Sequence, residues 1–150
     1  RPTPDRLRET LFNWLGQDLT GWHCVDAFAG TGALGLEAAS RGAADVLLVE
    51  SEGALVDQMR AVVRKLAADN VRVQRGNALS VLAGLPAAGV DVVFLDPPFD
   101  ANLYEKALAA SRAALAADGL VYLEAPSAWT DAMLAAYGLV VLRHVRSLVR

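Results

Sequence analysis

The sequence contains a single cysteine, Cys24, and only two histidines, His23 and His144. One thiol cannot form a disulfide within the chain, which is typical of proteins from a reducing cytoplasm. Cys24 lies in an apolar stretch, so we expect a small buried residue and not a nucleophile. The two histidines are far apart and have no cysteine or carboxylate at ligand spacing, and we therefore expect no metal.

Long hydrophobic runs are also lacking. No apolar stretch approaches the roughly 18 residues that a membrane helix needs, and no signal-peptide pattern is visible. The composition, 54% hydrophobic and 21% charged, is that of a packed globule and not of a disordered chain. We therefore expect a single cytoplasmic domain over residues 1–150, without contact to a membrane.

The chain has no excess of positive charge. Its net charge of −3 argues against nucleic-acid binding, because a nucleic-acid partner favours a basic surface. The charge is uneven, however. Residues 1–8 contain three arginines, Arg1, Arg6 and Arg8, and one acid, Asp5, whereas residues 138–150 contain cations and no acid. These clusters are either solvated chain ends or contacts to phosphate, and we take the first three arginines as candidate contacts.

The apolar periodicity divides the chain into alternating helices and strands. Leucines at spacing four indicate an amphipathic first helix, whereas short β-branched runs indicate buried strands. The expected helices cover residues 4–16, 33–41, 52–68, 78–83, 102–117 and 128–136. The expected strands cover residues 24–28, 46–49, 71–74, 90–95 and 120–124, and a last strand begins at 139–142 and continues raggedly to 150. This alternation predicts an α/β fold: a Rossmann-like, doubly wound, mostly parallel sheet with helices on both faces.

Polar side chains stand at the carboxyl ends of the expected strands. They are Asp26, Glu50, Asn77, Asp96 and Glu124. In doubly wound sheets ligands bind beyond these ends. We therefore expect the functional site at this edge of the sheet.

A glycine loop follows the first expected strand. Gly30, Gly32 and Gly35 fit the pattern G-x-G-x-x-G, and Glu50 lies 20 residues after Gly30. By itself this fingerprint suggests NAD. Asp26 argues against NAD, because its carboxylate would face the mouth of the loop, where a pyrophosphate needs to sit. S-adenosylmethionine has an ammonium and a sulfonium in place of phosphates and is therefore the favoured cofactor; the alternative for Asp26 is a cap of the following turn.

Other residues of the same edge are expected to contact the cofactor. Glu50 can accept hydrogen bonds from both ribose hydroxyls, although a solvent-facing strand end is the alternative. Asn77 offers a donor and an acceptor to the adenine edge, beside the N–H group of Ala78, although a plain turn asparagine is the alternative. We also expect contacts to the cofactor from Phe28, at the end of the first expected strand, and from Ser51, next to Glu50.

The tetrapeptide Asp96, Pro97, Pro98 and Phe99 is the sharpest signal in the sequence. The prolines fix the turn, so that Asp96 projects from the strand end towards the cofactor. A base amine can donate hydrogen bonds to the Asp96 carboxylate and the Pro97 carbonyl, which aims the nitrogen lone pair at the methyl group. Phe99 offers a face on which a flipped-out base can stack. We expect all four residues to be catalytic; a bland turn is the alternative.

Three segments of the chain resemble the RsmD family of bacterial 16S ribosomal RNA guanine-N2 methyltransferases. Residues 1–15, RPTPDRLRETLFNWL, resemble the opening helix motif of that family. Residues 26–38, DAFAGTGALGLEA, resemble its cofactor loop, and residues 92–99, VVFLDPPF, resemble its catalytic motif. The last two motifs are shared with many amine methyltransferases, including adenine-N6 DNA enzymes, whereas the opening motif is more specific.

The resemblance implies transfer of a methyl group from S-adenosylmethionine to N2 of a guanine in 16S rRNA, within a partly or fully assembled small ribosomal subunit. It implies the seven-stranded sheet of class I S-adenosylmethionine-dependent methyltransferases, and RNA as the partner of Arg1, Arg6 and Arg8. Members of the family normally have a basic segment before the opening motif and a final antiparallel hairpin. We expect the first to be missing here and the second to be incomplete in residues 139–150.

Three other functions compete with this interpretation. An adenine-N6 methyltransferase shares the catalytic motif, but the sequence has no obvious target-recognition domain for DNA. An NAD-dependent oxidoreductase is opposed by Asp26 and by the turn that begins at Asp96. A catalytically silent methyltransferase-like binding module is opposed by the intact motif over residues 96–99.

Overall fold

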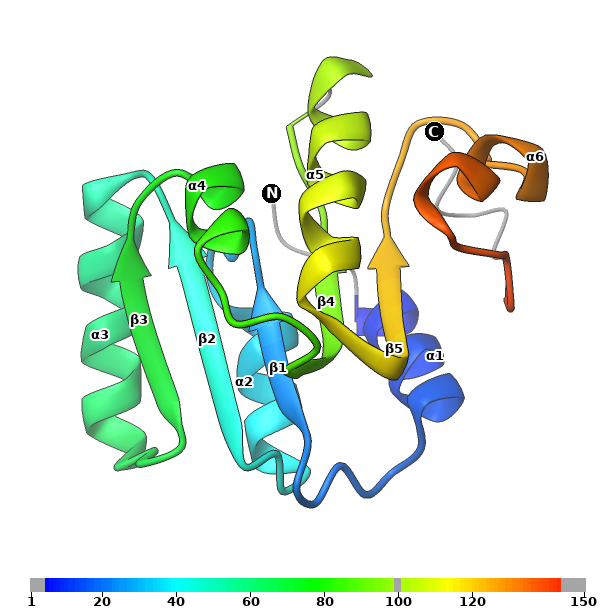
Figure 1. Cartoon of the computed structure of the whole chain (residues 1–150). Coiled ribbons are helices and arrows are strands. Elements are labelled where there is room, and N and C mark those ends of the chain that lie inside the picture. The colour runs from blue at the N-terminus through cyan, green and yellow to red at the C-terminus, as the bar shows by residue number, and fades with distance from the viewer. Residues whose placement is uncertain (1–4, 99–100, 144–150) are drawn as a thin grey trace.

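Five parallel strands form the central sheet of the computed structural model, which describes residues 5–98 and 101–143 (Figure 1). They are β1 (His23–Asp26), β2 (Asp45–Glu50), β3 (Val71–Arg75), β4 (Val90–Leu95) and β5 (Leu115–Leu123). The sheet has the order β3-β2-β1-β4-β5, and every neighbouring pair is parallel. The predicted doubly wound α/β fold is therefore confirmed, with five of the seven strands that the resemblance implies inside the described residues.

The direction of the chain reverses at the middle of the sheet. Strands β1, β2 and β3 extend to one side, and the chain then crosses back to place β4 on the other side of β1. At such a switch point the connections leave the carboxyl ends of β1 and β4 in opposite directions, which opens a crevice between them.

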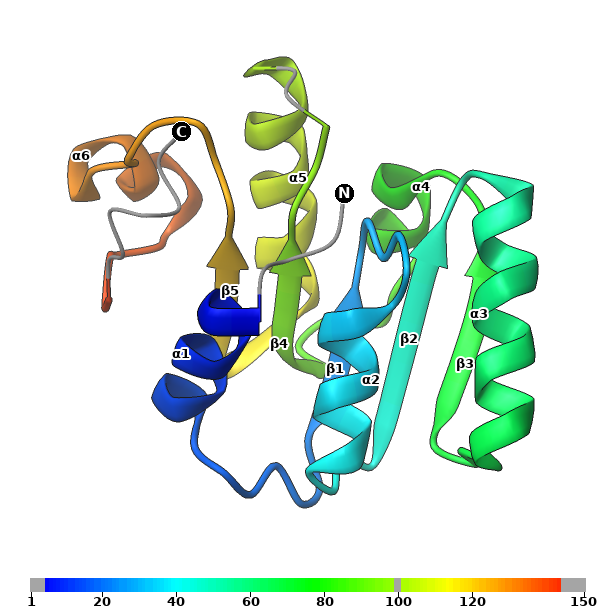
Figure 2. The same ribbon diagram turned by 180° about the vertical axis from the view of Figure 1, so that it is seen from behind.

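Helices cover both faces of the sheet (Figures 1 and 2). Helices α1 (Asp5–Leu15), α2 (Ala33–Ser40) and α3 (Gly53–Leu66) share one hydrophobic core with the sheet, whereas α4 (Ala78–Ala83) and α5 (Ala101–Ala114) share the other. Helix α6 (Asp131–Leu134) and the short 3-10 helix η1 (Ala135–Tyr137) follow β5. Among the helices of the described residues, none is long and apolar enough to cross a membrane.

The amphipathic first helix is confirmed as α1. Leu11 and Phe12 are buried in the core, and the Phe12 ring lies 6.0 Å from that of Phe94 in β4. Phe94 in turn packs edge-on against Tyr122 of β5 at 6.5 Å, and the guanidinium of Arg41 lies over Phe12. This row of rings fixes α1 across β4 and β5.

The helix expected over residues 102–117 is shorter than predicted. It ends at Ala114, and Leu115 enters β5 beside Val90 of β4. The next regular pair joins Leu120 to Val92, so the strand is irregular over residues 116–119. The alanine-rich sequence favours a helix throughout, but burial of Leu115 and pairing with β4 override this local preference.

Several other boundaries also differ from the prediction. The strand expected over residues 24–28 ends at Asp26, because residues 27 and 28 form a turn into the glycine loop. The helix expected over 128–136 is confined to α6 and η1. Residues 139–142 are not a strand: the N–H group of Leu139 donates to the Leu134 carbonyl and that of Val141 to Asp131, so this segment folds back onto α6. The expected continuation over 144–150 lies outside the described residues.

Candidate functional site

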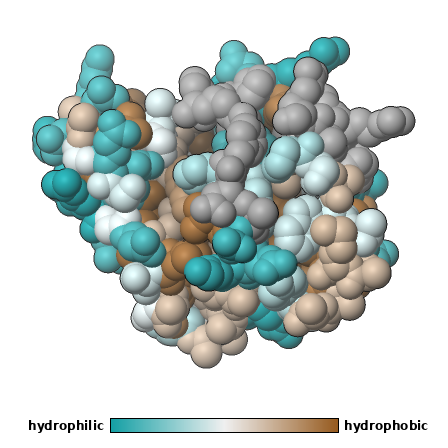
Figure 3. Space-filling view, turned by 90° about the horizontal axis from the view of Figure 1, so that it is seen from above, coloured by the Kyte–Doolittle hydropathy of each residue, from teal (hydrophilic) through white to brown (hydrophobic). Residues whose placement is uncertain are grey.

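A cavity of about 500 Å³ opens at the carboxyl ends of β1, β2, β3 and β4. Figure 3 looks onto this end of the molecule and shows hydrophobic residues between more hydrophilic margins. The structure brings nine of the predicted site residues to the wall of this cavity: Phe28, Gly30, Glu50, Ser51, Asn77, Ala78, Asp96, Pro97 and Pro98. The cavity therefore coincides with the crevice that the topology creates.

Some residues of the prediction lie elsewhere, and some lining residues were not predicted. Asp26 and Gly32 are buried and do not line the cavity, and Phe99 lies outside the described residues. Leu55, Leu79 and Leu103 complete the wall from α3, α4 and α5. Nothing in the sequence distinguishes these leucines from core residues, because helix periodicity alone does not show which apolar side chain borders a cavity.

Glu50 is held in place by backbone groups of two loops. The N–H group of Gly30 donates to Oε1 at 2.9 Å, and the N–H group of Glu52 donates to Oε2 at 2.9 Å. Each carboxylate oxygen can accept a second hydrogen bond. The carboxylate is thus oriented in advance at the wall and keeps acceptor capacity for a ligand.

Asp26 lies beneath the glycine loop with only 4% of its surface exposed. Its Oδ2 accepts a hydrogen bond from the N–H group of Gly35 at 3.0 Å, which ties the end of β1 to the first turn of α2. Burial raises the pKa of Asp26 to about 7; the Gly35 hydrogen bond opposes this, and the charge of Glu50 adds to it. Asp26 therefore caps the turn that follows, which was the alternative role, and its expected contact with the cofactor remains a prediction.

The glycines of the loop have separate structural reasons. Gly30 adopts φ of +59°, and nothing lies within 4 Å of the Cβ atom that another residue would add. Gly35 instead faces the sheet, where an added Cβ would collide with the side chain of Leu48 and lie 3.2 Å from Cγ1 of Val46. Gly30 therefore leaves the cavity open, and Gly35 lets α2 approach β2.

Asn77 is both a helix cap and a lining residue. Its Oδ1 accepts a hydrogen bond from the N–H group of Ser80 at 3.1 Å, at the start of α4. This cap uses only the side-chain oxygen, so the amide hydrogens of Asn77 remain able to donate to a ligand. The position beside Ala78 fits the predicted contact with an adenine edge, which stays a prediction.

The turn after β4 brings Asp96 to the wall of the same cavity as Gly30 of the glycine loop. Asp96 is half-buried, Pro97 is buried and Pro98 is exposed. The end of β4 is hydrogen-bonded to both neighbouring chain segments: the N–H group of Glu124, just past β5, donates to the Leu95 carbonyl at 2.9 Å, and the N–H group of Ala27, just past β1, donates to the Phe94 carbonyl at 3.1 Å. The carboxylate therefore extends from a strand end that is anchored on both sides.

The arginines predicted to contact RNA differ in their surroundings. Arg6 is exposed, whereas Arg8 forms ion pairs with Asp5 at 2.9 Å and Glu37 at 3.6 Å. Arg1 lies outside the described residues. Arg8 thus has two carboxylate partners, and contact between these arginines and RNA stays a prediction.

The structure also shows the surroundings of the cysteine and of potential metal ligands. Cys24 is buried, and burial raises the pKa of its thiol to about 12, so the thiolate is strongly disfavoured. Within residues 5–98 and 101–143, no group of three or more histidine, cysteine or acidic residues is able to hold a metal.

A second groove, of about 520 Å³, lies between α1, β5 and residues 139–143. Its wall is mainly apolar, and Arg143 is its one charged lining residue among those described. The groove reaches the carboxyl end of β5 at Leu123 and Ala125, but none of the described residues predicted to bind the cofactor or to be catalytic lines it, so the first cavity is the better candidate for chemistry.

The residues of the first cavity fit a cationic ligand without phosphate. Glu50 and Asp96 line its wall, and Asp26 lies buried behind the loop. The loop N–H groups of Gly30 and Gly35, which could bind a pyrophosphate, already donate to carboxylates. This donor pattern matches the ammonium, sulfonium and ribose of S-adenosylmethionine better than it matches a dinucleotide.

Comparison with known proteins finds relatives that are named as methyltransferases. It is 46% identical over 128 residues to ribosomal RNA small subunit methyltransferase D of Escherichia coli (strain K12), an alignment that covers 83% of this chain and 63% of the relative. The chain thus spans less than two thirds of that relative's length. The solved structure of yhhF from Escherichia coli matches with a TM-score of 0.75 and 43% identity, over 83% of this chain and 70% of the other. The Trypanosoma brucei PRMT1 enzyme-prozyme complex with AdoHcy matches with a TM-score of 0.64 and 28% identity, over 78% and 38%.

The sheet topology and these neighbours identify the class I S-adenosylmethionine-dependent methyltransferase fold. A family model described as conserved hypothetical protein 95 matches residues 1–144, nearly the whole chain. The chain therefore belongs to this family, the RsmD family.

Proposed function

We propose that this protein transfers a methyl group from S-adenosylmethionine to the exocyclic N2 amine of a guanine in 16S ribosomal RNA. One observation carries the proposal: Asp96 and Pro97 stand at the wall of the same cavity as Glu50 and the glycine loop. The turn that would orient the amine thus lines the same pocket as the groups that would hold the methyl donor. The RNA substrate is supported by the relative from Escherichia coli, whose name is that of a ribosomal RNA small subunit methyltransferase.

The cofactor-binding side of the cavity would act through groups that are already oriented. S-adenosylmethionine supplies a methyl group activated by a positively charged sulfur. Glu50 would accept the ribose hydroxyls with the acceptor capacity that its two backbone donors leave unused. Asn77 would donate its amide hydrogens to the adenine edge, and the carboxylate of Asp26 would favour a cation above the loop.

The substrate side would act mainly by positioning. The Asp96 carboxylate and the Pro97 carbonyl would each accept a hydrogen from the target amine, which directs the nitrogen lone pair into the cavity. Positive charge develops on the nitrogen as the new bond forms, and the Asp96 carboxylate is the group placed to stabilise it and to accept the excess proton. Phe99 would hold the flipped base by stacking.

The same observations disfavour the competing functions. NAD would require loop N–H groups that are engaged by Glu50 and Asp26. A silent binding module would have no need for an acidic turn at the cavity wall. Adenine-N6 transfer would use the same turn, so the identity of the modified base must be measured directly.

The test uses labelled S-adenosylmethionine and 30S particles from a strain that lacks the enzyme, incubated with the full-length protein. We expect label in 16S rRNA, recovered after digestion as N2-methylguanosine. Recovery of labelled N6-methyladenosine would instead show that the target base is adenine and not guanine. The absence of label in RNA, together with calorimetric binding of NAD, would contradict the proposal.

A further inference from the structure

A cationic surface, which we call the basic edge, lies along α3 and β3. Between residues 58 and 90 the chain has five cations and a single acid, Asp69, although its net charge is −3. All five cations are exposed: Arg60, Arg64, Lys65, Arg72 and Arg75. Helix α3 and strand β3 form one outer margin of the molecule in Figures 1 and 2, and Figure 3 shows hydrophilic residues along this margin.

The helical part of the basic edge follows the outer strand. Arg60 and Arg64 are four residues apart on α3 and therefore lie on the same side of the helix. An Nη2 hydrogen of Arg60 is donated to the Val73 carbonyl of β3 at 3.4 Å. Since β3 is the last strand of the described sheet on this side, the arginine stripe borders a strand edge that has one neighbour, β2.

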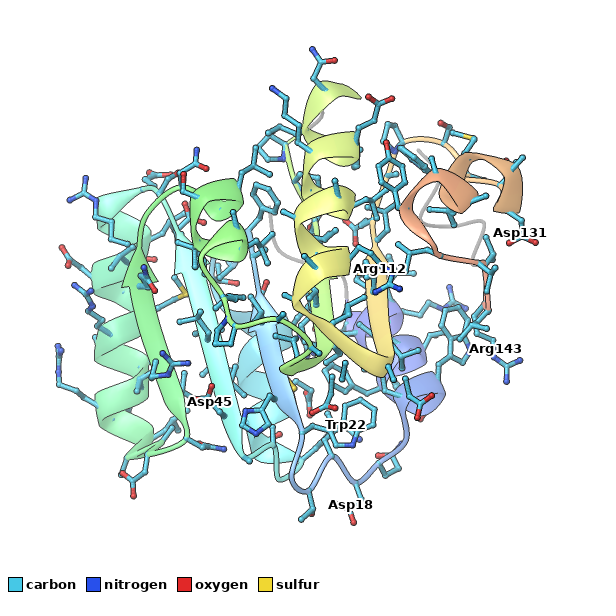
Figure 4. The ribbon with its side chains drawn as sticks, in the orientation of Figure 1. Asp18, Trp22, Asp45, Arg112, Asp131 and Arg143 are labelled. Carbon is cyan, nitrogen blue, oxygen red and sulfur yellow. The ribbon has the colours of Figure 1, made fainter. Side chains whose placement is uncertain are left out.

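The strand part of the basic edge is fixed by local contacts. Arg72 donates to Asp45 through Nε at 3.0 Å and Nη2 at 2.8 Å; Figure 4 shows Asp45 near the start of β2. The guanidinium of Arg75 lies flat over Gly53. A Cβ atom added to Gly53 would be 3.1 to 3.2 Å from the Cζ atom and both terminal nitrogens of Arg75. Arg75 directly precedes Gly76, which lines the cavity, so the basic edge reaches the cavity mouth.

We propose that the basic edge binds the phosphate backbone of the RNA whose target base enters the cavity, an inference that rests on the proposed function. Within the described residues, Arg72 is the one member of the basic edge that forms an ion pair with an acid. Three acids are next to the edge in sequence: Glu52 precedes α3, Asp57 lies in its first half, and Asp69 follows it. The second half of α3 therefore contains cations and no acid. A row of arginines with their charge uncompensated matches a polyanion, and phosphate contacts set the register of a nucleic acid on a protein.

The salt dependence of RNA affinity tests this inference. The probe is protein-free 16S rRNA, and binding is measured in the presence of AdoHcy over a range of salt concentrations. Arg60→Gln/Arg64→Gln should flatten the slope of log affinity against log salt by about 1.4 to 1.8, because two phosphate contacts are lost. Arg60→Lys/Arg64→Lys keeps the charge and should keep most of the slope.

Arg112→Gln/Arg143→Gln is the matched control. Both residues are exposed and lie on the other side of the molecule from α3 (Figure 4), so this variant makes the same change in net charge at a distance from the basic edge. The inference is overturned if the slope of the Arg60/Arg64 glutamine variant equals that of wild type, or if the control flattens the slope equally. It is also overturned if wild type does not bind the RNA.

Methylation of 30S particles, measured in parallel, separates this inference from the proposed function. If wild type methylates the particles while the glutamine variant keeps the wild-type slope, only the role of the basic edge fails. If wild type transfers no methyl group, the proposed function fails whatever the slope. Equal melting temperatures of all variants are expected, because the replaced side chains are exposed, and they would show that the fold is unchanged.

Discussion

Replacing Asp26 with Asn removes a buried charge and keeps an acceptor oxygen for the N–H group of Gly35. Burial raises the pKa of this carboxyl from 3.8 to about 7, so the folded protein binds the proton more tightly than the unfolded chain does. Well below pH 3.8 both states are protonated and ionisation carries no cost. Well above pH 7 both states are ionised, and a difference of about three pKa units corresponds to roughly 4 kcal/mol of lost stability. Stability should therefore fall as the pH rises between these values.

Urea unfolding at pH 5 and pH 8 measures this effect. With the pKa values above, wild type should lose roughly 2 to 3 kcal/mol of unfolding free energy between the two pH values through Asp26 alone. Asp26→Asn should lack this contribution and show a correspondingly flatter profile. The comparison concerns the change with pH and not absolute stability, because the added amide hydrogens can be left without an acceptor.

Asp57→Asn provides the control for the titration. Asp57 is an exposed aspartate of α3, so its replacement should leave the wild-type pH profile unchanged. Parallel profiles for wild type and Asp26→Asn would refute the argument that a buried, ionisable carboxyl lies under the loop. A steeper loss in the Asn variant would refute it as well.

Three further substitutions test the cavity and its support. Gly35→Ala should destabilise the fold by about 1 to 3 kcal/mol, measured by calorimetric unfolding, because the added methyl group overlaps Leu48 in a packed core; a wild-type melting temperature would contradict the close packing of α2. Glu50→Ala should weaken binding of AdoHcy by roughly 1.5 to 3 kcal/mol in calorimetry, because a charged acceptor is lost, and unchanged affinity would exclude the ribose contact. Phe99→Ala should cost about 1 to 3 kcal/mol of RNA stacking while AdoHcy affinity stays near wild type; a selective loss of AdoHcy binding would place this residue with the cofactor instead.

The sequence predicts the architecture well where local pattern and tertiary packing agree. The strand over residues 90–95 has the predicted bounds, because its apolar residues 92–95 are all buried, which favours a strand covered on both faces. The prediction fails at Leu115, where an alanine-rich helix former enters the sheet, and at residues 139–142, which turn back onto α6. In both places the deciding interactions join segments that are distant in sequence or depend on a side-chain acceptor such as Asp131.

The candidate site could be predicted through its polar residues and not through its apolar ones. Strand-end residues such as Glu50 and Asp96 stand out because a carboxylate is unusual beside a buried strand, and the topology brings them together. Leu103 was not predicted, since its place at the cavity wall depends on how α5 packs over β4. The excess of cations in the basic edge is visible in the sequence, where residues 58–90 contain five cations and a single acid, whereas the contact of Arg60 with Val73 of β3 is visible only in the folded protein.

Single-turnover methylation by Asp96 variants is the most direct test of the claim that this turn orients the target amine. Asp96→Ala removes the acceptor while leaving the glycine loop and Glu50 intact, so AdoHcy affinity should change little. The rate of methyl transfer should fall by roughly 10²- to 10³-fold, by analogy with the loss of one preorganised polar contact. Asp96→Asn keeps the shape and one acceptor oxygen and should lose less activity than Asp96→Ala. A near-normal rate in Asp96→Ala would show that the turn at residues 96–99 is not the catalytic site.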